Sequence, residues 1–597
     1  MTVAVLFVFS VFGAQLVRLQ GLDSSAVAAE ALAQRTADEV IPATRGTIRS
    51  SDGVVLASSV LRETVAVDQT AVCTYETGQQ TCTADGSPSA ISAATAKLAP
   101  LLGMSPDTLR PMLTGSARYR ILDKEVSEDT WLKIAALGIP GVYRDPAGAS
   151  AQRIYPQGAT TASLVGFTID NGQPGGGVEE MLNSTLTGSA GKASFETSAD
   201  GTIIPAGRQE ITPAKDGRSV TLTINSNLQW YAQNALAAKV KSTGALSGTV
   251  VAMDVRTGKL LAVASYPSFD PNNVGAAQGS LVNKAFNDVF EPGSTGKIMT
   301  IAAAMQQGHV TPTTPVVIPS QLHRWDTYFH DAEPHGTEYR TVAGTLAESS
   351  NMGTILIGET MQPSTLYGYF RKFGLGSTSG MGYPGESAGL LAPANQWSGT
   401  QRATVMFGQG LSVTAIQAAS VFQTIANGGV RIPPRLVQSV ESPDGAMVTQ
   451  PQPAGIRVVS DSVATQMSDM LEDVVSDQGT APAARIPGYR VAGKTGTADR
   501  YDAVVKGYSG KTASFIGYAP ADNPRIVIAV ILQRPVRGYY GGVVAAPVFH
   551  DIMTYALQEL QIPPTGTKPT TMPLSVSPAT ALADPHVLRD RPGSVNR

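Results

Sequence analysis

The chain has 597 residues, of which 15% are charged and 42% hydrophobic, and its formal net charge is −3. This length exceeds what one hydrophobic core usually supports, so we expect two or three folding units. The small negative net charge argues against the electrostatic attraction to phosphates by which proteins bind nucleic acids, so we expect no nucleic-acid partner. The 60 glycines and 39 prolines indicate a loop-rich protein that works outside the cytoplasm.

Residues 1–22 begin with an uncharged apolar run that ends before Arg18. We interpret these residues as a single-pass anchor in the plasma membrane, with the rest of the chain extracytoplasmic. The run is slightly shorter than the ~20 residues that cross a bilayer as a helix. It also lacks a basic flank in front of it, so we expect Met1 to be an internal start. A cleaved signal peptide is the alternative, although no small-x-small cleavage site follows the run.

Residues 23–218 alternate short strand-like runs with weak helices and glycine-rich turns, and they carry no recognisable catalytic cluster. Cys73 and Cys82 are the two cysteines of the chain, with Gly78 between them. A hairpin would bring them together, so we predict a structural disulfide worth about 2–3 kcal/mol. Neither cysteine is expected to be a nucleophile, because no histidine or basic residue nearby in sequence would lower a thiol pKa.

Residues 219–561 form the second predicted unit, in which a helix begins after Asn225. Two β-rich stretches meet at a turn over residues 256–258, and three more strand patterns, VAGKTGTAD, GKTASFIGYAP and PRIVIAVILQRP, come late in the unit. Strands at both ends with helices between them predict an α+β fold, an antiparallel sheet flanked by helices. Residues 562–597 are rich in Pro, Thr and Ser, so we predict a disordered tail.

The run EPGSTGK places Ser294 and Lys297 at the start of a predicted helix. A spacing of three residues puts the amine on the same helix face as the hydroxyl, within reach to act as its base. Lys297 can accept a proton only when neutral, so it must be buried near a second cation. A serine cap beside a solvated lysine is the plain alternative, and the same spacing recurs at Ser189 and Lys192.

A second motif, SSN, lies in GTLAESSNMG on a predicted turn between helical runs. Ser349 could relay a proton from Lys297 to a leaving nitrogen, and Asn351 could donate to a substrate carbonyl and accept from Lys297. The plain alternative is a capping serine followed by an ordinary turn asparagine. The same pattern recurs in the tail at Ser594 and Asn596.

A third motif, Lys494-Thr495-Gly496-Thr497, lies within the strand-like run VAGKTGTAD. A strand edge with a lysine and two hydroxyls suits an extended peptide with a free carboxylate, and Gly496 would let the substrate backbone approach closely. Lys494 would supply the second cation. The backbone N–H groups of Thr497 and Ser294 would form an oxyanion hole. A turn between two strands is the alternative.

The three motifs occur in order within one predicted unit, and together they are the signature of penicillin-binding proteins and serine β-lactamases. The chain resembles a class B penicillin-binding protein from the apolar run to about residue 560. Further matching segments are LVRLQ, ATRGTIRSSDGVVLAS, GVEEMLNSTLTGSAGK, LTINSNLQ and YPSFDPNN. GYPGESAGLLAP and ATVMFGQGLSVTAIQAASVFQTIANGG resemble the septal, FtsI-like branch. The chain departs from the family at RSSDG, where an Asp-Arg-x-Gly run is common.

This resemblance implies a D,D-transpeptidase that cross-links peptidoglycan stem peptides during septal cell-wall synthesis. Ser294 would attack the D-Ala-D-Ala carbonyl with Lys297 as base, while Lys494, Thr495 and Thr497 hold the terminal carboxylate. β-Lactams would acylate Ser294 by mimicking the dipeptide, and no metal or organic cofactor is implied. The first unit would be an elongated, mostly β pedestal, or dimerisation domain. It would dock a membrane-embedded glycosyltransferase and other division proteins.

Three other functions are the alternatives. A carboxypeptidase or β-lactamase of the same fold would use water in place of the acceptor amine. Glu386 lies near where class A β-lactamases carry a deacylating glutamate, but PGESAGLL does not match their Glu-x-x-Leu-Asn pattern. An elongation-type class B transpeptidase is the second alternative. The third, a non-enzymatic scaffold or β-lactam sensor, conflicts with the intact motifs and the absence of a recognisable signalling domain.

His323, His330, Asp331 and His335 cluster in the segment HRWDTYFHDAEPH. Such a cluster raises the question of a metal site. The spacing fits no common zinc pattern, and the predicted chemistry needs no metal. We therefore expect a structural or substrate-loop role for this segment.

Overall fold

The computed structural model describes residues 2–22, 35–75, 88–145, 150–169, 172–198, 204 and 207–590. The chain forms two compact units. The first comprises Met1–Thr47, Ser58–Ile154 and Ser184–Arg218, and the second comprises Ile48–Ala57, Tyr155–Asn183 and Ser219–Arg597. The chain therefore passes between the units several times before the second unit becomes continuous.

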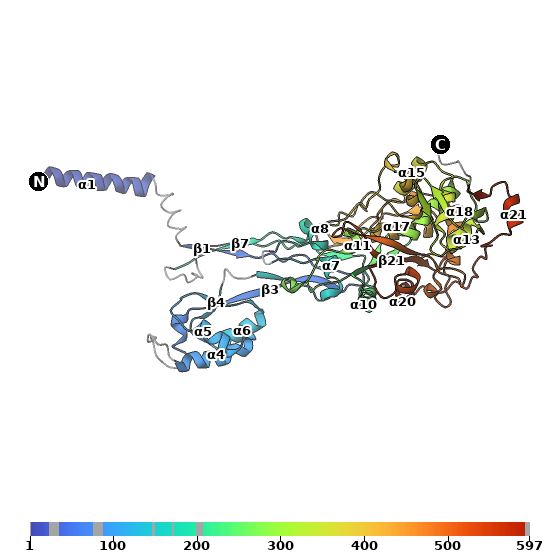
Figure 1. Ribbon diagram of the computed structural model, residues 1–597. Helices are drawn as coiled ribbons and strands as arrows, with labels where there is room; N and C mark the ends of the chain where they lie inside the picture. The colour runs from blue at the N-terminus through green and yellow to red at the C-terminus, as the bar shows by residue number, and fades with distance from the viewer. Residues whose placement is uncertain are drawn as a thin grey trace. The chain divides into compact units, whose positions relative to one another are not determined.

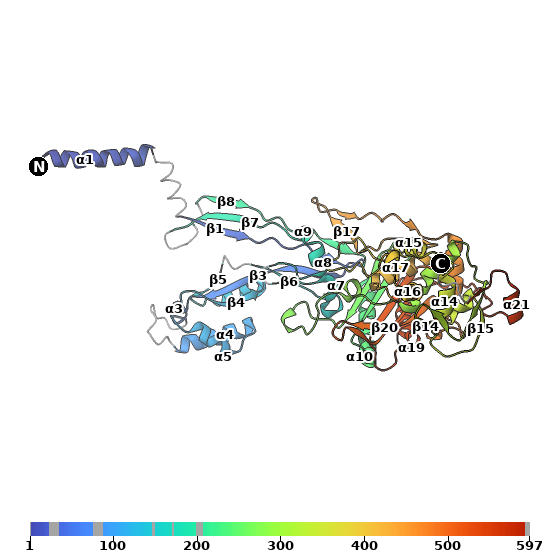
Figure 2. The same ribbon diagram turned by 45° about the horizontal axis from the view of Figure 1, so that its top comes forward.

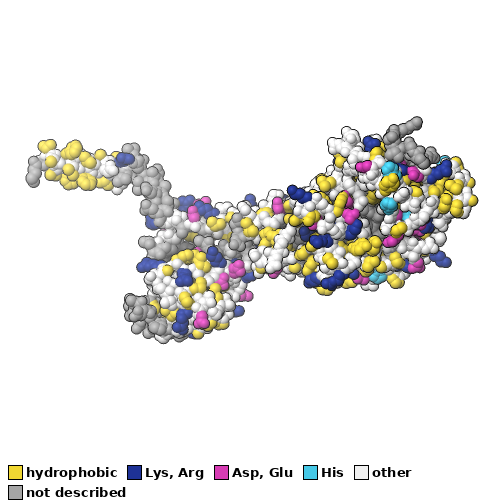
Figure 3. Space-filling model, viewed as in Figure 1, with side chains coloured by type: hydrophobic (Ala, Val, Ile, Leu, Met, Phe, Trp, Pro, Cys, Tyr) yellow, Lys and Arg dark blue, Asp and Glu magenta, His cyan; other side chains and the backbone are white. Residues whose placement is uncertain are grey.

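The first described helix, α1 (Thr2–Val17), contains 16 residues and none of them is buried. Its surface is mostly apolar, as the hydrophobic side chains over α1 in Figure 3 show. A short π-helical turn, Arg18–Leu22, follows it. Among the residues that the structure describes, no helix has both the length and the apolar character needed to cross a membrane.

Strands of the first unit form two groups. β1 (Thr36–Ile41), β7 (Gly191–Glu196) and β8 (Gln209–Thr212) make an antiparallel three-stranded sheet, which Figure 2 shows. In the second group β3 (Val55–Val67), from Ser58 onward, pairs antiparallel with β4 (Arg120–Val126), β5 (Val142–Arg144) and β6 (Ser150–Ile154).

Helices supply much of the core of the first unit. The helices are α3 (Gln69–Val72), α4 (Pro88–Leu102), α5 (Pro106–Leu113) and α6 (Glu128–Ala136). Their apolar side chains, such as Leu98, Leu109 and Ile134, pack with Val65 of β3 in one buried cluster. The first unit therefore mixes strands and helices, whereas a mostly β unit was predicted. The short helices gain most of their stability from packing, which their sequences show only weakly.

Cys73 directly follows α3 and is buried. It is disulfide-bonded. Its predicted partner, Cys82, lies outside the described residues.

The second unit is built on a five-stranded antiparallel sheet with the order β11-β10-β22-β21-β20. The strands are β10 (Ser247–Asp254), β11 (Leu260–Tyr266), β20 (Ala492–Asp502), β21 (Gly507–Ala519) and β22 (Ile526–Gln533). As predicted, the sheet combines strands from both ends of this part of the chain. β20 lies at one edge of the sheet.

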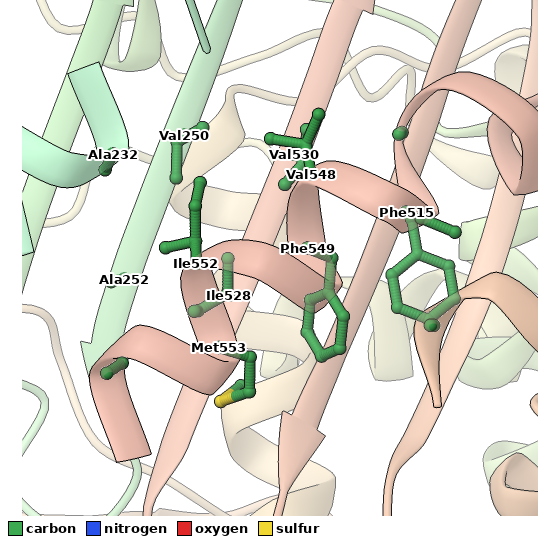
Figure 4. Packing of buried hydrophobic residues seen from close by; sticks show 14 of the residues in the cluster. Ala232, Val250, Ala252, Phe515, Ile528, Val530, Val548, Phe549, Ile552 and Met553 are labelled. Carbon is green, nitrogen blue, oxygen red and sulfur yellow. The ribbon is translucent and has the colours of Figure 1, made fainter. Parts of the chain in front are cut away.

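Two helices, α10 (Ser226–Thr243) and α20 (Ala546–Glu559), pack on one face of this sheet (Figure 1). Figure 4 shows Phe549, Ile552 and Met553 of α20 against Val250 of β10 and Val530 of β22. All five side chains are buried. Burial of such a side chain contributes about 1.5–3 kcal/mol, so this layer fixes the sheet that carries β20.

Helices on the other side of the sheet carry the first two motifs. They include α12 (Lys297–Gln306), α13 (Val342–Ala347), α14 (Asn351–Gly358), α17 (Ala415–Ala426) and α18 (Asp461–Asp473). α17 contacts β10, β21 and β22, and every one of its residues is buried. A capping box between Thr414 and Gln417 begins this helix. The α+β prediction for this unit is therefore confirmed.

The remaining elements of the second unit are short. The helices are α7 (Ala162–Val165), α8 (Gly177–Met181), α11 (Lys284–Asn287), α15 (Pro363–Lys372), α16 (Gly399–Thr404) and α19 (Gly541–Val544). The strands are β2 (Ile48–Arg49), β9 (Val220–Leu222), β12 (Pro315–Ile318), β13 (Leu322–Arg324), β14 (Thr327–Phe329), β15 (Glu338–Thr341), β16 (Val430–Arg431), β17 (Val437–Glu441), β18 (Met447–Thr449) and β19 (Ile456–Arg457). At the boundary between the units lies α9 (Asn183–Leu186).

The segment after residue 561 was predicted to be disordered, and for residues 562–590 this prediction was wrong. The segment contains α21 (Pro578–Ala583) and β23 (Leu588–Arg589), and β23 pairs in parallel with β12. Ala581 and Val587 are buried. Composition misled here because the order comes from backbone hydrogen bonds to a distant strand, which local sequence does not reveal.

Candidate active site

Ser294 lies in a short 3₁₀ turn, Gly293–Gly296, that leads directly into α12. The backbone N–H of Gly293 donates to the carbonyl of Gly408 at 2.9 Å, and Thr300 Oγ1 donates to the carbonyl of Met406 at 2.7 Å. Gly408 has a φ of 85°, and a Cβ there would overlap the carbonyl of Gly293. The segment around Gly408 therefore fixes the turn that presents Ser294.

Lys297 is the first residue of α12, and its side chain is fully buried. Its Nζ donates to the carbonyl of Ser349 and, at 3.3 Å, to Ser349 Oγ. Burial lowers the pKa of Lys297 to about 7, and the carboxylate of Asp331 opposes this shift. Near neutral pH a large share of Lys297 is therefore in the form that can accept a proton.

Lys494 of β20 is also fully buried. Its Nζ donates to Thr495 Oγ1 at 3.2 Å and to the Thr495 carbonyl at 3.4 Å. Burial lowers the pKa of Lys494 well below its ordinary value, and the positive charge of Lys297 lowers it further. The two amines therefore interact, and protonation of one disfavours protonation of the other.

Ser349 has a left-handed backbone with a φ of 65°, a conformation that is uncommon for residues other than glycine. In this conformation both its carbonyl and its hydroxyl face Lys297 Nζ. Ser350 caps α14 by accepting from the backbone N–H of Gly353. Asn351 Nδ2 donates to the carbonyl of His330 at 3.3 Å, so in this state its amide is bound within the protein.

Asp331 is a site residue whose role the sequence reasoning missed. Its Oδ1 accepts from the backbone N–H groups of Asn351 and Met352, and its Oδ2 accepts from Ser350 Oγ and His335 Nε2. Asp331 was noticed only as part of the histidine cluster. An acidic residue in a polar loop gives no signal of the helix that it will cap.

The histidine cluster itself is dispersed in the structure. His323 packs against Tyr328 with the rings tilted and their centroids 4.4 Å apart, whereas His335 is hydrogen-bonded to Asp331. Among the described residues, no group of three or more His, Cys, Asp and Glu side chains is arranged to hold a metal ion.

The third motif lies on the edge strand β20. Thr495 Oγ1 is 2.8 Å from Thr480 Oγ1, and Thr497 Oγ1 accepts from the backbone N–H of Gly541 at 3.1 Å. A Cβ on Gly496 would overlap Ser514 Oγ and lie 3.0 Å from the carbonyl of Pro292. The structure thus gives Gly496 a reason other than the one predicted: β20 packs directly against the turn that carries Ser294.

One cavity of about 420 Å³ brings the three motifs together. Ser294, Ser349, Asn351, Thr495 and Thr497 line it, and the two buried lysines bond to residues of its wall. Lining residues that sequence reasoning missed are Gly293, Ala332, Glu333, Glu348, Phe407, Gln409, Thr480, Tyr540, Gly541, Gly542 and Val543. Of these, the run GYYGG carried a signal, because paired glycines beside tyrosines often mark a close backbone approach.

The residues that repeat the spacing of the first two motifs do not belong to this site. Ser189 and Lys192 belong to the first unit, whereas the three motifs belong to the second. Ser594 and Asn596 lie outside the described residues. Both carboxylate oxygens of Glu386 accept from Ser379 at 2.9 Å, so this side chain stabilises a loop.

Comparison with known families finds two matching domains in this chain. Residues 248–554 match the family described as "Penicillin binding protein transpeptidase domain", and residues 40–222 match "Penicillin-binding Protein dimerisation domain". The chain belongs to the class B penicillin-binding proteins. This penicillin-binding protein is 33% identical over 590 residues to penicillin-binding protein PbpB of Mycolicibacterium smegmatis, covering 94% of this chain and 90% of that protein. It is 34% identical over 452 residues to the peptidoglycan D,D-transpeptidase FtsI of Escherichia coli K12, covering 75% and 73%.

Solved structures resemble this penicillin-binding protein over most of its length. Penicillin-binding protein 3 from Mycobacterium tuberculosis, complexed with aztreonam, superposes with a TM-score of 0.69 at 30% identity. The match covers 90% of this chain and 100% of that one. A peptidoglycan synthetase from Bifidobacterium adolescentis gives a TM-score of 0.71 at 31% identity, covering 91% and 100%.

Proposed function

We propose that this penicillin-binding protein is a peptidoglycan D,D-transpeptidase that acts through a Ser294 acyl-enzyme during septal cell-wall synthesis. The observation that carries the proposal is one cavity that holds Ser294 together with Ser349, Asn351, Thr495 and Thr497, backed by two buried lysines. The relative from Escherichia coli is named a peptidoglycan D,D-transpeptidase, FtsI. The names FtsI and PbpB favour the septal role over elongation.

The donor peptide binds as an extended strand along β20, whose outer edge pairs with no strand of the described sheet. Its terminal carboxylate is held by the hydroxyls of Thr495 and Thr497 and by the charge of Lys494. Asn351 exchanges its bond to the His330 carbonyl for one to an amide carbonyl of the substrate. The motif over residues 494–497 thereby selects peptides that end in a free carboxylate.

In the acylation step, the Lys297 amine acts as the base that activates Ser294. Neutral Lys297 takes the proton of Ser294 as Oγ attacks the carbonyl of the penultimate D-Ala. The backbone N–H groups of Ser294 and Thr497 stabilise the oxyanion. Ser349, bonded to Lys297, carries the proton to the departing nitrogen, so that D-Ala leaves as a neutral amine and Lys297 is neutral again.

An amine of a neighbouring stem peptide attacks the acyl-enzyme in the second step and frees Ser294. β-Lactams mimic the dipeptide and leave a stable acyl-enzyme. Solved structures of the relative from Mycobacterium tuberculosis with aztreonam and with ampicillin support this part of the proposal. No step of this scheme requires a metal or an organic cofactor.

The proposal includes a location and partners. Residues 1–22 anchor the protein in the plasma membrane, and the catalytic unit is extracytoplasmic. The apolar, unburied surface of α1 supports the anchor. The first unit, which contains most of the residues that match the dimerisation domain, docks a membrane-embedded glycosyltransferase and other division proteins.

Labelling tests the nucleophile. The full chain in detergent is treated with a fluorescent penicillin, and the labelled peptide is identified by mass spectrometry. We expect label on Ser294, loss of label in Ser294→Ala, and full label in Ser189→Ala, which removes the decoy of the same spacing in the first unit. Label that persists in Ser294→Ala contradicts the proposal.

Product analysis tests the fate of the acyl group. The full chain receives a donor stem peptide that ends in D-Ala-D-Ala together with an excess of an amine acceptor. We expect cross-linked peptide to exceed the hydrolysed peptide. A product formed mainly with water supports a carboxypeptidase, and a penicilloyl-enzyme that lasts only seconds supports a β-lactamase.

A further inference from the structure

We propose that Asp331 is a positioning residue for the transpeptidase reaction: its carboxylate fixes the SSN motif on α14 and thereby holds Ser349 against Lys297. The inference rests on the proposed function, because it assigns the role of a residue in the same site. Asp331 comes from the loop after β14, twenty positions ahead of Asn351 in the chain. It reaches the motif only through the tertiary fold.

Four contacts converge on this carboxylate. The backbone N–H groups of Asn351 and Met352 donate to Oδ1, at 3.1 Å for Met352. Ser350 Oγ donates to Oδ2 at 2.5 Å, and His335 Nε2 lies 3.2 Å from the same oxygen. An ionised carboxylate accepts about four hydrogen bonds, so these contacts use its full capacity. The side chain of Asp331 is 12% exposed, which shields these bonds from competing water.

The contacts complete the start of α14. The first N–H groups of a helix have no partner within the helix and need an acceptor from elsewhere. Ser350 serves Gly353, while Asp331 serves Asn351 and Met352. A negative charge at this end also interacts favourably with the helix dipole. The position of α14 relative to Lys297 therefore depends on one side chain outside the motif.

The carboxylate also acts on the proton of Lys297. Its charge opposes the effect of burial on the pKa of Lys297. On β20, burial and the charge of Lys297 lower the pKa of Lys494, and Glu333 and Glu348 line the cavity itself. Glu348 is paired with Arg340 at 2.9 Å.

His335 adds a titrating neighbour on the other side of Asp331. Burial acts to lower the pKa of His335, but the Gly336 carbonyl, Glu338 and Asp331 outweigh it, so the net shift is upward. The pH dependence of acylation must therefore be assigned to Lys297 or to His335 by separate variants.

Asp331→Asn is the decisive variant, because it removes the charge and keeps an oxygen for the backbone N–H groups. The rate constant of acylation of the full chain by a fluorescent penicillin is measured from pH 5 to pH 9. We expect the plateau to fall by ~10-fold or more, because misplacement of reacting groups by ~1 Å costs about 100-fold. We also expect the acid limb to move to lower pH, because Lys297 loses a neighbouring anion and releases its proton more easily.

Three further variants make the result specific. Asp326→Asn makes the same change in the preceding turn, between β13 and β14, where Asp326 accepts from Thr400, and should leave the profile as in the unmodified protein. Ser350→Ala removes one contact of Asp331, and with it the cap bond to the Gly353 N–H, but keeps the charge, so the plateau should fall while the acid limb stays in place. His335→Gln should lower the plateau less than Asp331→Asn does and leave the acid limb in place.

The overturning results are distinct from failure of the proposed function. A folded Asp331→Asn variant with an unchanged plateau, or with a lower plateau and an unmoved acid limb, contradicts the positioning role. An acid limb that moves equally in His335→Gln assigns the titration to His335 and also contradicts it. If Asp331→Asn does not fold, a Ser350→Ala profile identical to that of the unmodified protein overturns the inference. In each case the unmodified protein still acylates Ser294, whereas failure of the proposed function abolishes that acylation.

Discussion

At the scale of single residues, the site depends on burying two amines that would each be charged in water. Lys297 and Lys494 are both fully buried, and neither forms an ion pair among the described residues. A buried ammonium is costly, and the cost appears as a lowered pKa. The protein therefore sacrifices stability at this point to obtain a lysine that can act as a base near neutral pH.

The variant Lys297→Met should separate the catalytic role of the amine from its cost in stability. Methionine has a similar length and no charge, so the variant should lose acylation by about 10²- to 10⁴-fold, the usual worth of a general base. In the folded protein the pKa of Lys297 is lowered from 10.5 to about 7. Between these two pH values the unfolded chain binds a proton at this lysine that the folded protein does not bind, so the free energy of unfolding decreases as the pH falls toward 7. The variant should therefore have a higher Tm than the unmodified protein at pH 6. A lower Tm at pH 6 would mean that the amine stabilises the fold.

Ser349 offers a second test at this scale, because its φ of 65° is costly for any side chain. Ser349→Ala and Ser349→Gly both remove the hydroxyl that bonds Lys297, so both should acylate slowly. Glycine tolerates a left-handed backbone, so the glycine variant should be more stable than the alanine variant by about 1 kcal/mol. Urea unfolding and penicillin labelling measure the two quantities. Equal stability of the two variants would argue against strain at Ser349.

At the scale of elements, β20 and the 3₁₀ turn of Ser294 are packed too closely for a side chain between them. A Cβ on Gly496 would overlap Ser514 Oγ and approach the Pro292 carbonyl to 3.0 Å. A Cβ on Gly293, next to the nucleophile, would lie 3.0 Å from the Cβ of Ala498 on β20. The strand and the turn thus hold each other in place.

Gly496→Ala should push the turn away from β20. We expect acylation by a fluorescent penicillin to fall at least about 10-fold and the Tm to fall as well, because overpacking costs about 1–3 kcal/mol. Gly368→Ala is the matched control, because Gly368 lies in α15 with no atom near its Cβ position. Alanine is a better helix former, so this control should keep or raise the Tm. Normal acylation in Gly496→Ala would show that the turn does not depend on this packing.

The C-terminal segment supports the SSN motif from a distance. Thr341, the cap of α13, donates through Oγ1 to the Pro573 carbonyl, and a Cβ on Gly344 of α13 would overlap the Leu574 carbonyl. Buried Arg324 pairs with Asp590 at 3.0 Å as well as with Glu359. α13 leads directly to Ser349.

Deletion of residues 573–590 should therefore lower both the Tm and the rate of acylation. Asp590→Asn is the milder variant, because it removes one partner of Arg324 and leaves β23 in place. We expect it to lower the Tm by less than the deletion does, since Glu359 still neutralises Arg324. Differential scanning fluorimetry and penicillin labelling of the full chain measure both. A deletion variant with unchanged acylation would show that the segment is not needed to position α13.

At the scale of the whole molecule, the chain combines a catalytic unit with a unit that lacks the three motifs. The second unit holds the cavity and the five-stranded antiparallel sheet. The first unit has its own sheet and its own helical core.

The septal role predicts where the protein works in the cell. A fluorescent fusion of the full chain should concentrate at the division site, and depletion should produce elongated cells with unfinished septa. Signal along the side wall, with loss of cell width control on depletion, would assign the protein to elongation instead. The Ser294→Ala variant should localise normally and fail to support division, which also excludes a scaffold role.

The sequence by itself determined the chemistry, because three short motifs occur in order within one unit and together are the signature of one class of serine acyl-transfer enzymes. Ser294 with Lys297, the SSN run and the Lys494 run could be found without a structure. The sheet of the second unit was also predictable, because its strands are long apolar runs such as IVIAVILQ. These features depend on neighbours in the chain.

Only the tertiary structure decided the features that depend on distant neighbours. Whether Lys297 and Lys494 are buried, why position 496 must be glycine, and that Asp331 caps α14 all follow from contacts between separate segments. The order of residues 562–590 has the same origin. Composition and periodicity report what a segment prefers alone. Burial and hydrogen-bond partners are set by the rest of the fold.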